Sequence, residues 1–74
     1  MKASVEIVRD FNKKYYASAY LDDEPVHGLP EYVSFPALRQ AVRYHVGICL
    51  PNAQQLEWTR MGRKQYAHFS GEVA

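Results

Sequence analysis

The sequence holds a single cysteine, Cys49, among 74 residues. One thiol cannot close an intramolecular disulfide, so we expect no disulfide framework and a reducing compartment such as a cytoplasm. The chain also lacks any apolar run near the roughly 18 residues that a membrane-spanning helix needs. Residues 1–6 hold no continuous apolar segment, so we expect neither a signal peptide nor a membrane partner.

An excess of charge of one sign is also missing, since nine basic and eight acidic side chains leave a formal net charge of +1. A protein whose main task is to coat nucleic acid is expected to be strongly basic. The charge is nevertheless uneven along the chain. Residues 1–37 carry a net charge of −2 and residues 38–74 a net charge of +3. Nucleic acid therefore stays open as a partner mainly for the C-terminal half.

Apolar residues make up 47% of the chain, which is too many for a disordered segment. The length predicts one domain over residues 1–74. A chain of this size buries only about 60% of the surface that its unfolded form exposes. We therefore expect a small core and a modest free energy of unfolding.

Residues 4–21 predict a β-hairpin with a polar turn at Asn12-Lys13-Lys14. A three-residue loop there pairs Phe11 with Tyr15 and Arg9 with Ala17. One face is then apolar except for Arg9, and it holds Val5, Ile7, Phe11, Tyr15, Ala17, Ala19 and Leu21. The other face holds Glu6, Val8, Asp10, Tyr16, Ser18 and Tyr20. That separation indicates a hairpin with one buried face.

Residues 22–33 are expected to form a loop, since Pro25 and Pro30 disfavour helix before them. A helix is predicted over residues 34–48, with Ser34 as its N-cap. Its apolar residues fall at helical spacing: Phe35, Leu38, Ala41, Val42, Val46 and Cys49. Gly47 weakens the helix and places its end there or shortly beyond.

Residues 55–70 predict a second hairpin that turns at Gly62-Arg63, with glycine first in a type II′ turn. Its expected pairs are Leu56 with Phe69, Trp58 with Ala67, Arg60 with Gln65, Glu57 with His68 and Thr59 with Tyr66. A short helix over residues 53–61 is the alternative. The fold class is thus α+β, ββαββ: an antiparallel sheet of two hairpins with one amphipathic helix on one face.

No motif commits the chain to a chemistry. His27, His45 and His68 match no structural zinc spacing, so we expect no metal. His45 is expected at the edge of the core, and His68 opposite Glu57. Cys49 lies on the apolar stripe of the predicted helix, which favours a buried, inert thiol over a nucleophile. We therefore expect a protein that is not an enzyme, with no catalytic residue and no cofactor.

Two surfaces remain as candidate binding sites. One is basic and consists of Arg39, Arg43, Arg60, Arg63 and Lys64. It could contact phosphates or serve as solubilising charge. The other is the open face of the sheet, with Tyr16, Tyr20, Tyr66 and His68. Exposed tyrosines suit protein interfaces, and the acidic side chains of the same face disfavour phosphates.

The segment from Tyr15-Tyr16-Ala17 through Gly28-Leu29-Pro30 to Ser34, Leu38 and Ala41 resembles the hairpin-then-helix start of HicB-type antitoxins. The resemblance covers about a third of the chain, and Glu31 stands where that family usually has glycine. We carry no functional residue over from it. Size and layout are similar to those of small phage or mobile-element proteins, including anti-CRISPR-type inhibitors.

The leading hypothesis is a small, non-catalytic protein-interaction module, and one form that it could take is a phage or mobile-element protein that inhibits a host protein, as anti-CRISPR-type inhibitors do. Its expected sites are the open sheet face and the flank of the helix. The alternative is a small nucleic-acid-binding or regulatory protein, antitoxin-like, that uses the basic C-terminal half. The sequence leaves a homodimer open, because an uncovered sheet edge can pair with a second copy.

Overall fold

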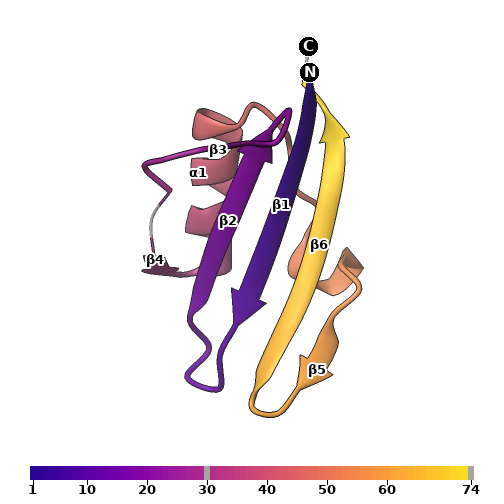
Figure 1. The fold of residues 1–74 in the computed structure, drawn as a ribbon. Helices are drawn as coiled ribbons and strands as arrows, with labels where there is room; N and C mark the ends of the chain where they lie inside the picture. Colours follow the sequence, from indigo (N-terminus) through magenta and orange to yellow (C-terminus); the bar gives the residue numbers. More distant parts are fainter. Residues whose placement is uncertain (30, 74) are drawn as a thin grey trace.

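The computed structural model describes residues 1–29 and 31–73, and for residues 31–33 it describes the backbone alone. Within these ranges the chain forms one antiparallel sheet with one α-helix on one face, an α+β fold of ββαββ-like order (Figure 1). The elements are β1 (Lys2–Arg9), β2 (Tyr15–Leu21), β3 (Glu24–Pro25), β4 (Glu31–Val33), α1 (Phe35–His45), the 3₁₀ turn η1 (Ala53–Gln55), β5 (Thr59–Met61) and β6 (Lys64–Glu72). The strand order is β3-β2-β1-β6-β5, and β4 pairs separately with β2.

The first predicted hairpin forms from β1 and β2, but its register differs from the predicted one by two residues. Arg9 lies opposite Tyr15, not opposite Ala17. Because side chains alternate with a period of two, this shift keeps every strand residue on its predicted face. Phe11 is the exception, since it leaves the strand and is 63% exposed in the loop.

The register is set by Asp10, which closes a three-residue loop over residues 11–13. Its backbone N–H donates to the Lys14 carbonyl at 2.9 Å. Its Oδ1 accepts from the backbone N–H of Asn12 at 2.9 Å and of Lys14 at 3.0 Å. Lys13 takes a left-handed φ of 62°, the usual conformation at the end of such loops. The predicted length of the loop is therefore confirmed, and its predicted position is wrong by one residue.

β1 is central, because it pairs antiparallel with β2 on one side and with β6 on the other. The β1–β6 pairing joins the two ends of the chain. The Val73 N–H donates to the Met1 carbonyl at 2.8 Å, and the N-terminal ammonium lies 3.6 Å from the Glu72 carboxylate. As a result, the β1–β2 loop and the β5–β6 turn lie together at the end of the sheet opposite the two termini (Figure 1).

The segment expected as a loop over residues 22–33 contains β3 and β4. Asp22 and Asp23 both take positive φ, of 48° and 68°, and form a tight turn of the primed kind that returns β3 onto β2. Asp22 is also held by Lys2, whose backbone N–H donates to Asp22 Oδ1 at 2.8 Å. Asp22 and Asp23 of the segment expected as a loop therefore form a hairpin turn.

The helix α1 begins at Phe35, with Ser34 extended at the N-cap position and proline in the first turn. It ends at His45, three residues before the predicted end. Gly47 causes the early end, because its φ of 87° is left-handed and its N–H turns back to the Val42 and Arg43 carbonyls.

After the helix the chain is extended and alternates between buried and exposed side chains. Val46, Ile48 and Leu50 are buried, and Gly47 and Cys49 between them are exposed. The expectation of a buried Cys49 is therefore wrong. The thiol falls at helical spacing in the sequence but lies beyond the last helical residue.

His45 was also expected at the edge of the core, and this expectation is wrong. Its side chain is exposed, and its ring packs edge-on against Tyr44, with the ring centroids 5.0 Å apart. The last turn of the helix is thus open to solvent on this side, because the chain leaves the helix axis at Gly47.

The second hairpin is confirmed in its register and its turn. Thr59 lies opposite Tyr66 and Arg60 opposite Gln65, as predicted. Gly62 has the positive φ, 64°, that the first position of a type II′ turn requires.

The predicted start of this hairpin, however, is wrong. Leu56 to Trp58 are not in the ladder, so the pairs that they were expected to form with β6 are absent. Residues 53–55 form the 3₁₀ turn η1 instead, with reciprocal capping by Asn52 and Gln55. The Trp58 indole N–H donates to the Ala53 carbonyl at 2.7 Å. Both alternatives for residues 53–61 were thus partly right.

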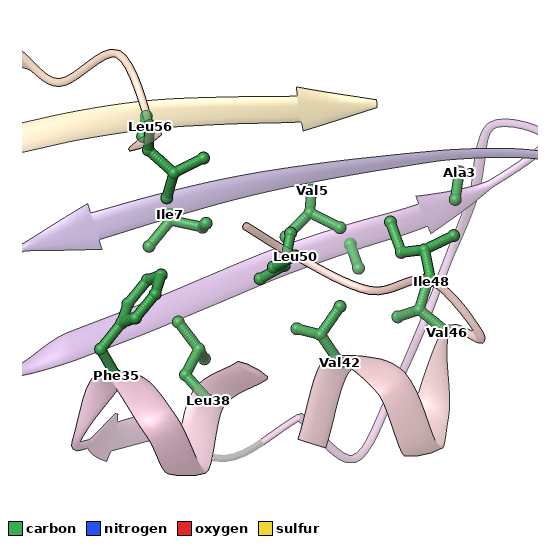
Figure 2. Close-up of a cluster of buried hydrophobic side chains, with 12 residues drawn as sticks. Ala3, Val5, Ile7, Phe35, Leu38, Val42, Val46, Ile48, Leu50 and Leu56 are labelled. Carbon is green, nitrogen blue, oxygen red and sulfur yellow. The ribbon is translucent and has the colours of Figure 1, made fainter. Parts of the chain in front are cut away.

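The core lies between α1, the extended segment after it and one face of the sheet. Figure 2 shows Phe35, Leu38 and Val42 of α1 pointing toward β1. The full set of buried side chains is Ala3, Val5, Ile7, Ala19, Phe35, Leu38, Val42, Val46, Ile48, Leu50, Leu56 and Ala67. Burying each large aliphatic side chain stabilises the fold by about 1.5–3 kcal/mol. This packing leaves the opposite face of the sheet without a cover among the described elements.

Arg9, the charged misfit on the apolar face, is accommodated at the margin of the core. Its guanidinium lies 4.5 Å from the centroid of the Trp58 ring. Its Nε donates to Gln65 Oε1 at 2.6 Å, and a second guanidinium nitrogen donates to the same oxygen. A cation over an indole face is electrostatically favourable. Arg9 therefore ties β1 to β6 and to the segment before β5.

Candidate functional site

The uncovered face of the sheet carries the three tyrosines that the sequence assigned to it. Tyr16 and Tyr66 flank Val8 in one row across β2, β1 and β6, and Tyr20 lies opposite Ser4 further along. Tyr20 is 41% exposed and Tyr66 38% exposed, and Tyr16 is half-buried. The Lys64 ammonium lies 6.0 Å from the centroid of the Tyr16 ring. This face combines aromatic surface with polar neighbours.

A groove of about 560 Å³ opens on the same face along β1, β6 and β5. Its lining residues are Glu6, Ile7, Glu57, Thr59, Met61, Tyr66, Ala67 and His68. Met61 is 64% exposed and supplies, with Tyr66, the accessible apolar surface of the groove. Sequence reasoning missed Met61, although its alternation with Thr59 across β5 places both on the open face.

Two carboxylates, Glu6 and Glu57, line this groove. Both side chains are exposed, and neither has an ion-pair partner among the residues that the structure describes. Glu57 was expected to pair with His68, and this is wrong. His68 Nε2 is instead hydrogen-bonded to Ser4 Oγ at 2.8 Å. The carboxylates are therefore open to a cationic partner.

Ser4 Oγ and His68 Nε2 are placed as a nucleophile and its base would be, but the described residues supply no other part of a catalytic site. In the described part of the chain, no carboxylate is hydrogen-bonded to the His68 ring. The pair is also exposed rather than enclosed. A catalytic serine needs an oriented base and donors for the oxyanion. The absence of catalysis remains a prediction.

Across the described residues, no group of three or more histidine, cysteine or acidic side chains is arranged to hold a metal ion. The three histidines belong to different segments: His27 follows β3, His45 ends α1 and His68 lies on β6. In the same residues, no helix has the length and apolar character needed to cross a membrane.

The five basic residues that the sequence grouped together do not form one surface. Arg39 and Arg43 lie on α1, on the side of the molecule that packs over the core. Arg39 is half-buried, and its Nε donates to the Leu50 carbonyl at 3.0 Å. Arg43 is exposed beside it. The other three, Arg60, Arg63 and Lys64, lie at the β5–β6 hairpin.

The β5–β6 turn and the β1–β2 loop together form a cationic end of the sheet. Between them lies a cleft of about 400 Å³, lined by Arg9, Asp10, Phe11, Lys13, Tyr15, Arg60, Arg63 and Gln65. Sequence reasoning missed the contribution of Arg9 and Lys13, because it compared the charge of the two halves of the chain. The available signal was that both predicted turns are basic.

Comparison with protein-family models, with curated proteins and with solved structures finds no match to this chain. Two surfaces of the molecule are therefore the candidate sites, the acidic groove on the open face and the cationic cleft between the hairpin loops.

Proposed function

We propose that the protein is a non-catalytic interaction module that binds another protein in the acidic groove of its open sheet face. The observation that carries the proposal is the placement of Glu6 and Glu57 in one groove with Met61 and Tyr66. An occupant of matching chemistry is a protein segment that presents a lysine or arginine next to an apolar side chain.

The charge of the groove favours such a segment over nucleic acid. Two carboxylates without an internal partner attract a cation and repel phosphates. Polar and charged pairing of this kind sets the choice of partner and the rate of association. Met61 and Tyr66 supply the apolar contact, and tyrosine and methionine are enriched at protein interfaces. The other two tyrosines extend the surface away from the groove.

The test compares partners captured from the source cell by three forms of the full chain. The forms are wild type, the groove variant Glu6→Gln/Glu57→Gln, and the control variant Asp23→Asn/Glu24→Gln. The control removes two exposed carboxylates at the β2–β3 turn, so the change of net charge is the same.

Quantitative mass spectrometry then identifies proteins that wild type and control retain and the groove variant loses. We expect such a protein, with affinity about tenfold or more weaker for the groove variant when measured with purified components. Tyr66→Ser should weaken it as well. The proposal fails if every captured protein binds the groove and control variants equally.

A further inference from the structure

We infer that the cleft between the β1–β2 loop and the β5–β6 turn binds single-stranded nucleic acid, at a site separate from the acidic groove. The cleft collects cations from strands that are far apart in the sequence, and it places an exposed aromatic ring among them. The inference does not depend on a protein partner, because none of the groove carboxylates lines this cleft.

The concentration of charge at this end is the first observation. Six of the nine lysines and arginines belong to the two loops and the strand ends beside them: Arg9, Lys13, Lys14, Arg60, Arg63 and Lys64. Four of the eight acidic residues lie at the other end of the sheet, at the β2–β3 turn and at the end of β6: Asp22, Asp23, Glu24 and Glu72. A nearly neutral chain thus becomes a molecule with one cationic end.

The second observation is that the cations lining the cleft are not neutralised by any acidic side chain among the described residues. Arg9, Lys13, Arg60 and Arg63 have no ion-pair partner among the described residues. Asp10 is the one acidic side chain in the lining, and its Oδ1 already accepts two backbone N–H groups. An anion in the cleft would relieve the repulsion between the cations, so binding of phosphate groups is electrostatically favoured.

The third observation is that contacts between the two loops form the cleft before any ligand binds. The Arg63 guanidinium lies 5.6 Å from the centroid of the Phe11 ring, which joins one loop to the other. Arg9 is held by Gln65 on the neighbouring strand. Ordered cations lose less entropy on binding than mobile ones.

The exposed ring of Phe11 indicates which class of ligand the cleft binds. Its ring is 63% exposed and lines a cleft whose volume, about 400 Å³, is within the usual range for a small-ligand site. A cationic groove with an accessible aromatic ring is the combination that binds single strands, because the backbone meets the cations and an unpaired base stacks on the ring. In a duplex the bases are already stacked and cannot reach the ring.

The test measures fluorescence anisotropy of a labelled oligothymidylate of about 15 nucleotides with the full chain, from about 50 to about 200 mM salt. Contacts from Lys13, Arg60 and Arg63 to three phosphates give an expected slope of about −2 in log affinity against log salt. Arg60→Ala/Arg63→Ala should weaken binding about tenfold or more at low salt and reduce the slope to below about 1 in magnitude. Phe11→Ala should weaken binding about tenfold without changing the slope.

The matched control is Lys2→Ala/Arg43→Ala, which removes the same charge from exposed residues outside the cleft. We expect it to change affinity less than about twofold.

The inference is overturned if the control weakens binding as much as the cleft variant, if wild type does not bind at low salt, or if a duplex of the same length binds equally well. Heparin, which has no bases, should lose less affinity than the oligothymidylate on Phe11→Ala, because it loses only the ordering of Arg63 and not the stacking of a base. An equal loss for heparin contradicts base stacking. Glu6→Gln/Glu57→Gln should leave oligonucleotide binding intact, so this result is independent of the protein partner.

Discussion

Arg39, on the helix, donates from Nε to the backbone carbonyl of Leu50 at 3.0 Å. A second guanidinium nitrogen donates to Asn52 Oδ1 at 2.8 Å. The planar guanidinium thus joins α1 to the chain that returns toward β5. A residue that the sequence assigned to a basic binding surface thus has a structural role, whereas Arg43 beside it is exposed and makes no side-chain hydrogen bond or ion pair with the described residues.

We expect Arg39→Ala to lower the free energy of unfolding by about 1–3 kcal/mol, because it leaves the Leu50 carbonyl without its donor. Arg39→Lys should recover only part of this, since an ammonium cannot reproduce the forked geometry. Urea denaturation followed by Trp58 fluorescence measures both. Arg43→Ala is the control, with an expected change within about 0.5 kcal/mol. Equal effects at the two positions would show that the Arg39 bonds contribute no stability.

Asp10 determines the register of the first hairpin through the two N–H groups that its carboxylate accepts. Asp10→Ala should destabilise the fold by about 1–2 kcal/mol, because both donors lose their partner. Asp10→Asn keeps an oxygen at the same place and should cost less. Amide hydrogen exchange at Asn12 and Lys14 reports the loop directly. Unchanged protection in Asp10→Ala would contradict this role.

Gly47 ends the helix in a conformation that L side chains rarely adopt. A Cβ at this position would lie 3.1 Å from Val73 Cγ1, whereas a Cβ at Gly62 would meet nothing within 4 Å. Both glycines have positive φ, so Gly62→Ala isolates the backbone strain, about 1–2 kcal/mol. We expect Gly47→Ala to lower the thermal midpoint further than Gly62→Ala. The reverse order would mean that Val73 moves aside without cost.

Cys49 is exposed in the native fold, so it should react with a thiol reagent such as Ellman's reagent without denaturant. The reaction should be complete while the far-UV circular dichroism remains native. A thiol that reacts only after addition of urea would place Cys49 in the core and contradict the early end of the helix. Cys49→Ser should leave the stability within about 0.5 kcal/mol of the wild type.

Much of the fold could be predicted because local patterns and tertiary packing agree. The alternation over residues 4–21 identified the hairpin and its buried face, and a register error of two residues does not change that face. The spacing of Phe35, Leu38 and Val42 identified the helix and its core side. The glycine at position 62 identified the second turn.

The errors at the end of the helix have one physical cause, which is that one apolar spacing can belong to two conformations. Val46 and Cys49 continue the helical stripe, but Val46, Ile48 and Leu50 also alternate as in extended chain. The left-handed Gly47 decides between the two, and the exposed Cys49 follows from it. The late start of the second hairpin has another cause. Asn52 caps a 3₁₀ turn over Ala53–Gln55, so the first strand of the hairpin begins only at Thr59.

By itself the sequence determined the α+β class, the faces of the two hairpins and the tyrosine-bearing open surface, since these depend on periodicity along one segment. The two candidate surfaces were decided by the tertiary structure alone. The cationic cleft forms because β1 pairs with β6 and brings two basic turns to one end of the sheet. The acidic groove forms because the same pairing sets Glu6 opposite His68, beside Glu57. The pairing of strands from opposite ends of the chain cannot be predicted from a local sequence pattern, because that pairing is stabilised by the core that the strands share.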